Sequence, residues 1–272
     1  MLDKLFVFDI ETIPDTDAVY NLLGIESDDV GYLREELEKY HVEVSGGNPF
    51  PRQMFHKPIS VSVLIADIEK TDGGFEYYKI NKVGTFSSIK NTEKQIVEKF
   101  FDYLSKHLPR IVDYNGRTFD LPVMKYRAMK YYISAPKLFK AGDKWNNYQQ
   151  KYSLDWHCDL LDALSDFGSS CRCKMNEVCS ILGIPGKIGV DGSKVADMYD
   201  AGKLQDIDNY CETDVLNTYL VYLNYQLLVG NINNESFIKM NQDLINYLQD
   251  EGKEHFFEFL NEWEKVDERG LF

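Results

Sequence analysis

KLFVFDI, at residues 4–10, is the stretch from which the fold can be worked out. It is short, apolar and aromatic, which is typical of a strand buried at the centre of a sheet. Residues 58–68 (PISVSVLIADI) alternate and are rich in β-branched side chains, so they predict a second strand. The turn-forming sequence TDGG then leads into a returning strand at 75–80, which completes a hairpin. Two further short strands are expected at 110–115 and 155–161.

Between and after these strands, apolar residues recur at helical spacing. Residues 14–56 are mostly polar and acidic, and we expect an insertion there over one end of the sheet, while 183–192 (GIPGKIGVDG) is expected to be a loop. The element order predicts an α/β fold, in which an antiparallel meander and βα units with right-handed crossovers form a mixed five-stranded sheet flanked by helices. Helices are predicted at 28–40, 92–107, 121–132, 175–182, 193–201, 206–229, 235–248 and 253–264, the last two as extra C-terminal helices.

Length and composition restrict the class of protein. The 272 residues, 44% hydrophobic and 27% charged, predict a globular chain with a sizeable core. Five cysteines, an odd number in a large chain, favour reduced thiols. Charged residues interrupt the first dozen positions, and no apolar run approaches the roughly 18 residues of a membrane span. We therefore expect a cytoplasmic protein without a membrane partner.

The charge is strongly acidic and unevenly distributed. Thirty Lys and Arg against 44 Asp and Glu give a net charge of −14, which argues against a long footprint on nucleic acid. A few nucleotides at one site remain possible if metal ions or a local basic patch offset the acidity. Residues 117–151 reverse the balance, with eight bases against two acids and interleaved aromatics. This stretch is interpreted either as a single-strand binding surface or as a solvated helix and loop.

Paired carboxylates carry the strongest chemical signal. Asp9 and Glu11 are two residues apart on the first strand, so their side chains share a face. Two acids side by side in a buried sheet repel each other unless a cation lies between them, and oxygen ligands favour Mg²⁺ or Mn²⁺. Two further elements, NGRTFDLP at 115–122 and YCETD at 210–214, add acids. Taken alone, Asp120 is equally an N-cap, and Tyr210 and Asp214 are equally an ordinary i, i+4 surface pair.

In combination, these motifs resemble those of DnaQ-like 3′–5′ exonucleases. The order D-x-E, N-x3-F-D and Y-x3-D is similar to the DEDDy branch, because Asn209 stands where the DEDDh branch has histidine. The segments YNGRTFDLPVMKYRAM, HCDLLDAL, LGIPGK, DGSKV and YCETDVLNTYL resemble stand-alone predicted 3′–5′ exonucleases related to the exonuclease domain of family B DNA polymerases, over about residues 4–230.

The resemblance implies a fold, a cofactor and a reaction. The fold would be RNase H-like. Asp9, Glu11, Asp120 and Asp214 would hold two Mg²⁺ or Mn²⁺ ions, and Tyr210 would orient the attacking water. The expected reaction releases nucleoside 5′-monophosphates from single-stranded 3′ ends of DNA or RNA. Substrate contacts are assigned to Asn115, Phe119, Arg117 and Lys187. The alternative is a catalytically idle module that keeps the fold and binds nucleic acid or a protein.

Two further expectations concern the domain boundary and the cysteines. Residues 1–230 are expected to form the exonuclease domain, with 231–272 as an acidic helical extension packed on it. Cys171, Cys173 and Cys179 lack the paired C-x2-C spacing of structural zinc sites, so ordinary thiols are favoured over a zinc site.

Overall fold

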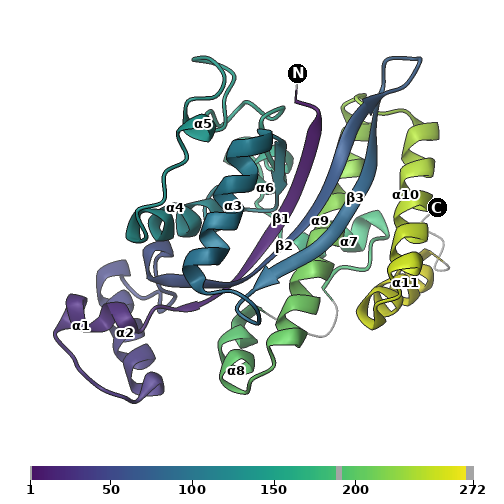
Figure 1. The fold of residues 1–272 in the computed structure, drawn as a ribbon. Coiled ribbons are helices and arrows are strands. Elements are labelled where there is room, and N and C mark those ends of the chain that lie inside the picture. The colour runs from purple at the N-terminus through teal and green to yellow at the C-terminus, as the bar shows by residue number, and fades with distance from the viewer. Residues whose placement is uncertain (1, 188–191, 268–272) are drawn as a thin grey trace.

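Strands β1–β5 form one mixed five-stranded sheet, as predicted, and their spatial order is β3-β2-β1-β4-β5. Figure 1 shows β1, β2 and β3 side by side. The computed structural model describes residues 2–187 and 192–267. β1 pairs antiparallel with β2, which pairs antiparallel with β3, and β1 pairs parallel with β4, which pairs parallel with β5. The strands are Lys4–Pro14 (β1), His56–Lys70 (β2), Glu76–Ser87 (β3), Arg110–Asp113 (β4) and His157–Asp159 (β5).

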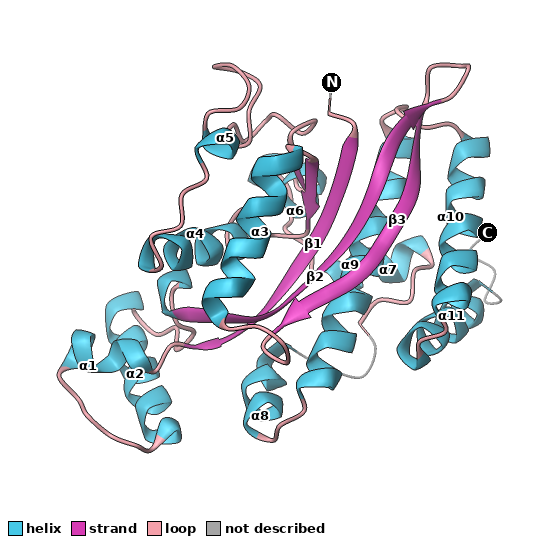
Figure 2. Cartoon of the chain, in the orientation of Figure 1, coloured by secondary structure: helices cyan, strands magenta, loops and turns pink. Residues whose placement is uncertain are grey.

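Helices cover both faces of this sheet, as Figure 2 shows. Helices α3, α9, α10 and α11 lie where apolar spacing predicts them. The described helices are Asp17–Leu23 (α1), Val30–Ser45 (α2), Glu93–His107 (α3), Asp120–Lys130 (α4), Pro136–Phe139 (α5), Leu160–Leu164 (α6), Met175–Leu182 (α7), Val195–Asp200 (α8), Leu204–Leu228 (α9), Asn234–Glu251 (α10) and Glu254–Asp267 (α11).

The alternation of side chains along β1 separates two cores. Phe6 and Phe8 pack with α3 and α4 in one buried cluster. Leu5 and Val7 face the other way and pack with α9, α10 and α11 in a second cluster. Because the side-chain period of a strand is two, Asp9 continues the row of Leu5 and Val7. The acids therefore lie on the face of the sheet that α9 covers.

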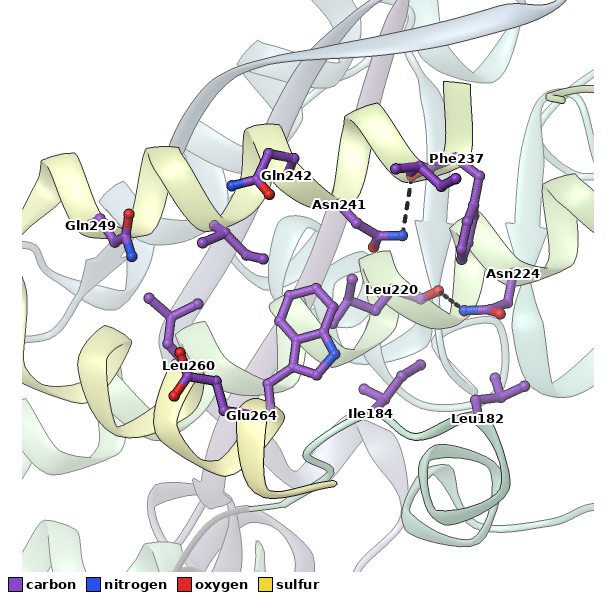
Figure 3. A pocket seen from close by; sticks show the side chains of 13 residues that line it. Leu182, Ile184, Leu220, Asn224, Phe237, Asn241, Gln242, Gln249, Leu260 and Glu264 are labelled. Atoms are coloured by element: carbon purple, nitrogen blue, oxygen red, sulfur yellow. Dashed lines mark hydrogen bonds between the residues drawn. The ribbon is translucent and has the colours of Figure 1, made fainter. Parts of the chain in front are cut away.

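The C-terminal helices add apolar side chains to the core of that face. Met240 and Leu248 of α10 and Phe256 and Phe259 of α11 are fully buried in the same cluster as Leu5 and Val7. Between α10, α11 and α9 there is an apolar pocket of about 420 Å³. Figure 3 shows this pocket, with Gln242 on one side and with Leu182 and Ile184, which precede Lys187, on the other.

Some elements differ from the sequence predictions. The strand expected at 110–115 ends at Asp113, and the one expected at 155–161 is paired only over His157–Asp159 before α6 begins. Helix α1 was not predicted, because it is seven residues long and has no side-chain cap. Residues 14–56 do form an insertion, in which α1 and α2 share a small core of their own. Residues 188–191 of the expected 183–192 loop lie outside the described residues.

The basic stretch 117–151 is not one exposed surface. Arg127 is 2% exposed, and its guanidinium is paired with Asp15 and Glu93. Arg117 is directed to Asp162, at 3.5 Å. The interpretation of all eight bases as a binding face is therefore wrong for Arg127, whose charge neutralises buried acids. No helix in the described part of the chain is both long and apolar enough to cross a membrane.

Candidate active site

Two of the predicted acids stand together at the end of β1. Asp9 and Glu11 place carboxylate oxygens within 4.8 Å of each other and of the Cys211 sulfur, in the one group of potential metal ligands found among the described residues. Glu11 is 9% exposed. The Cys211 thiol donates to the Asp9 carbonyl at 3.4 Å and to its Oδ2 at 3.7 Å. The D-x-E spacing therefore does put both acids on one face of a strand, as predicted.

Asp120 reaches the same place from α4. β4 pairs with β1 only as far as Val7, so the backbone N–H of Ile10 has no strand partner on that side. Asp120 Oδ1 accepts this N–H at 3.2 Å. The N-cap position of α4 belongs to Phe119, so the capping interpretation of Asp120 is wrong. Its carboxylate instead accepts a hydrogen bond from the backbone of Ile10, the residue between Asp9 and Glu11 in β1.

Helix α9 brings the last pair of predicted residues. Tyr210 and Asp214 are one turn apart and both buried, at 4% and 3% exposure, so the surface-pair interpretation is wrong. The Lys187 ammonium lies 3.0 Å from Asp214 Oδ2 and donates to the Tyr210 hydroxyl. Asp214 Oδ1 is buried and has no hydrogen-bond partner among the described residues.

The clustered carboxyl groups of Asp9, Glu11 and Asp120 have raised pKa values, because burial and their neighbours destabilise the charged forms. Burial, and then the charges of Asp120 and Asp214, raise the pKa of Asp9 well above its usual range. Burial and the neighbouring Asp9 do the same to the pKa of Glu11. Burial, followed by Asp113, raises the pKa of Asp120 to about 8. These carboxylates repel one another, and Asp214 Oδ1 has no hydrogen-bond partner among the described residues. A hard divalent cation fits such a set of oxygen ligands.

Tyr210 is held in its protonated form. Burial raises the pKa of its phenol, and the charges of Asp214, Glu11 and Asp9 raise it further. A phenol with a raised pKa keeps its proton at neutral pH, so it can donate a hydrogen bond but is a poor general base.

The loop before α4 is shaped by acids beneath it. Asp159 accepts the backbone N–H groups of Asn115 and Arg117, at 3.0 Å each, and so fixes the loop that leads to Asp120. Asn115 has the left-handed φ of 72°, whereas Gly116 does not. Gly116 is needed because a Cβ at this position would lie 2.4 Å from Asp113 Cγ. Asp113 Oδ1 accepts the Gly116 N–H at 3.1 Å.

A cleft of about 800 Å³ opens beside these residues. It is lined by Asp9 and Asp214, and by two of the predicted substrate contacts, Asn115 and Lys187. The other two are placed differently. Phe119 packs against His56, at 5.0 Å between ring centroids. The Arg117 side chain is directed to Asp162 and to the His157 carbonyl.

Three residues at the site were not predicted from the sequence. Arg172 and Lys174 line the cleft, and Cys211 lies beside Asp9. The first two fall in the stretch CRCK at 171–174, which lies outside the three motifs and whose cysteines do not have the spacing of a structural zinc site. The sequence marks Cys211 only by its position next to Tyr210. The described part of the chain contains no cluster of cysteines at metal-binding distance, since the group at Asp9 includes one cysteine only.

Comparison with protein families agrees with this geometry. Residues 48–263 match a family described as predicted 3′–5′ exonucleases related to the exonuclease domain of PolB. The chain belongs to this family. The matched residues include Asp120, Tyr210 and Asp214. The match begins after Asp9 and Glu11, but the hydrogen bond from Ile10 to Asp120 joins their strand to the matched part of the chain. No curated protein matches the chain. The predicted family is thus confirmed, together with the mixed α/β sheet of the RNase H-like exonuclease fold.

Proposed function

We propose that the protein is a metal-dependent 3′–5′ exonuclease that releases nucleoside 5′-monophosphates from single-stranded 3′ ends of DNA or RNA. The observation that carries the proposal is a cleft of about 800 Å³ with Asp9 and Asp214 in its wall, next to which Glu11 lies beside Asp9 and Asp120 is hydrogen-bonded to the backbone of Ile10. The volume is within the range of about 300–1,000 Å³ that is usual for ligand sites.

In this proposal, Asp9, Glu11, Asp120 and Asp214 hold two Mg²⁺ or Mn²⁺ ions. Two bound ions lower the pKa of a water nucleophile and stabilise the leaving 3′-oxygen of an in-line displacement. The unpartnered Oδ1 of Asp214 supports its assignment as a ligand. So do the raised pKa values of the Asp9 and Glu11 carboxyl groups, since a cation between them would relieve the repulsion.

In this proposal, the remaining site residues bind the substrate or orient the attacking water. Tyr210 keeps its proton and uses the hydroxyl to position the attacking water, without acting as the base. Asn115, at the cleft wall, contacts the terminal nucleotide, and Phe119 supports it from the loop before α4. Lys187 binds the phosphate that is attacked, and Arg117 contributes positive charge from beneath the loop.

Metal-dependent release of mononucleotides tests this function. Matched 5′-labelled DNA and RNA oligonucleotides would be incubated with the protein and Mg²⁺, Mn²⁺ or EDTA. We expect a ladder that shortens from the 3′ end only with metal. Asp9→Ala and Asp214→Ala should each retain less than about a tenth of the rate, since a metal ligand is removed. Asp250→Ala, at an exposed position on α10, is the matched control.

The alternative of an idle binding module makes a different prediction. A module that only binds would leave both oligonucleotides intact with either metal. Thermal unfolding separates loss of metal from loss of fold: Mn²⁺ should raise the midpoint of the wild type and do much less for Asp9→Ala. An equal rise in both proteins would place the ions elsewhere on this acidic chain.

A further inference from the structure

Basic side chains line the cleft beside the acids. Arg172, Lys174, Lys187 and Lys194 all contribute to its wall, whereas the chain as a whole has a net charge of −14. The acids in the wall of the described cleft, Asp9 and Asp214, are proposed metal ligands. The cleft therefore combines a site for cations with a local excess of bases. Such a local field attracts a polyanion even when the whole protein repels it.

Arg172 is anchored in an orientation that leaves part of it exposed. Its guanidinium donates to Asp162 Oδ1 at 2.8 Å and to Asn115 Oδ1 at 3.1 Å, and its side chain is 37% exposed. Asp162 is also paired with Arg117 at 3.5 Å and with Lys151 at 3.9 Å. One buried carboxylate is thus shared by three cations, which fixes Arg172 and leaves positive charge that Asp162 alone does not neutralise.

The wall that carries Arg172 is joined to the catalytic side of the cleft. Lys174 is exposed and immediately precedes α7, where its backbone N–H donates to Glu177 Oε2 at 2.5 Å. At the start of α7, Asn176 Oδ1 accepts the backbone N–H of Lys187 at 2.7 Å. Residues 172–176 therefore contact Asn115 at one end and Lys187 at the other, and Lys187 in turn contacts Asp214.

We propose that Arg172 and Lys174 form a phosphate track, which binds the backbone of a single strand on the 5′ side of the nucleotide that is removed, with Lys194 contributing from the start of α8. The proposal rests on the proposed exonuclease function. The guanidinium fork of Arg172 can bind a phosphate through two N–H groups, and Lys174 supplies a point charge. The track recognises phosphate charge, so it serves DNA and RNA alike.

A competing path would run over the basic stretch near α4 and α5. Two of its bases are already committed, because Arg127 is paired with Asp15 and Glu93, and Lys130 lies 3.3 Å from Asp15. Lys137 and Lys140 at α5 are exposed. They offer a control that removes the same charge from the other path.

The test measures binding and cleavage separately. A 5′-fluorescein oligothymidylate is titrated by anisotropy over a series of salt concentrations, with Ca²⁺ in place of Mg²⁺ and with strand integrity checked on a gel. The proteins are the wild type, Arg172→Ala/Lys174→Ala and the control Lys137→Ala/Lys140→Ala. Cleavage is measured with Mn²⁺ on the oligonucleotide and on thymidine 5′-monophosphate p-nitrophenyl ester, which has a phosphodiester but no upstream phosphate. Thermal midpoints establish that each variant folds.

We expect Arg172→Ala/Lys174→Ala to weaken binding about tenfold or more and to reduce the slope of log Kd against log salt by about 0.7 for each phosphate that the variant no longer neutralises. The decrease in kcat/KM should be larger for the oligonucleotide than for the ester, and the control should behave as wild type. Arg172→Lys should keep the salt slope, because it keeps the charge.

Three results would overturn the track. The first is that Arg172→Ala/Lys174→Ala has the same slope of log Kd against log salt as the wild type, while the wild type still trims oligonucleotides. This result would exclude the track and leave the exonuclease function intact. The second is an equal decrease in the Lys137→Ala/Lys140→Ala control, which would move the strand to the α4–α5 side. The third is a wild type that neither binds nor trims the strand, which would remove the exonuclease function and the track together.

Discussion

The Nζ atom of Lys187 lies 3.0 Å from Oδ2 of Asp214, although 27 positions separate the two residues along the chain. The same ammonium donates to the hydroxyl of Tyr210. A lysine thus contacts a carboxylate that we assign to the metal ions, and its pKa is raised by Asp214, Asp9 and Glu11 against the opposing effect of burial. An ammonium group and a divalent ion would both stabilise these acids, so in the proposed metal site they would compete for Asp214.

Lys187→Met tests this competition. The substitution keeps an unbranched side chain that is shorter by one atom and removes its charge. Without metal, the free energy of unfolding should fall by about 1 kcal/mol, as for a partly exposed ion pair, and the thermal midpoint by about 2 °C. Added Mn²⁺ should then raise the midpoint more than in the wild type, because no ammonium has to be displaced. Lys140→Met is the matched control, and an identical Mn²⁺ response in wild type and Lys187→Met would contradict the competition.

Tyr210→Phe separates orientation from metal binding. Phenylalanine preserves the packing of the ring and removes the hydroxyl that contacts Lys187 and Asp214. We expect single-turnover rates to fall by one to three orders of magnitude at saturating Mg²⁺, since positioned proton-handling groups typically contribute about 10²–10⁴-fold. The Mn²⁺-induced thermal shift should stay close to that of the wild type. A rate within about twofold of wild type would reduce Tyr210 to a packing residue.

Gly116→Ala tests the loop that positions Asn115 and Asp120. A Cβ at residue 116 would lie 2.4 Å from Asp113 Cγ, so the loop or the Asp113 side chain must shift. Overpacking of this kind costs about 1–3 kcal/mol of the free energy of unfolding, measured by denaturant titration. Exonuclease activity should fall as well, because Asp120 follows the loop directly. Gly31→Ala, in the first turn of α2, is the control: its Cβ would lie 3.2 Å from the exposed Asp29 Oδ1, so it should cost less stability than Gly116→Ala and leave activity unchanged. Equal stability of both variants would show that the loop tolerates the methyl group.

Glu76→Gln tests a buried ion pair far from the cleft. Glu76 on β3 is paired with Arg110 on β4 at 2.6 Å. Burial raises the pKa of Glu76, but the hydrogen bond from Arg110 and its positive charge outweigh this effect and lower the pKa to about 2. Because the pKa is depressed in the folded state, the stabilisation is present above the unfolded pKa near 4.5 and is lost as the pH falls toward 2. The free energy of unfolding should fall by about 2 kcal/mol between pH 6 and pH 3 from this group.

That decrease should be missing from Glu76→Gln, which should also be less stable than wild type at pH 7 because Arg110 loses its charged partner. Glu98→Gln, at a pair exposed on α3, is the control and should keep the wild-type pH profile. Parallel pH profiles of wild type and Glu76→Gln, measured by urea titration, would contradict the assignment.

Local periodicity was sufficient to predict most of the elements. Strand β1 alternates Phe6 and Phe8 with Leu5 and Val7, and the structure buries the two sets in different cores. The same period of two predicts that Asp9 and Glu11 lie on one face of the strand. Periodicity failed for short elements: β5 is three residues long and α1 seven. Such segments are held by their neighbours, because their own length is too small to specify them.

The sequence by itself determined the sheet, the long helices and the three motifs, since each depends on residues that are close together in the chain. Only the tertiary structure decided which side chains meet. Asp120 contacts the backbone of Ile10 across 110 positions, and Cys211 contacts Asp9 across 202. It also buried Arg127 against Asp15 and placed Arg172 in the cleft wall. A local pattern fixes the direction of a side chain relative to its own helix or strand. Its partners depend on strand order and on how the helices pack across the sheet, to which distant parts of the chain contribute.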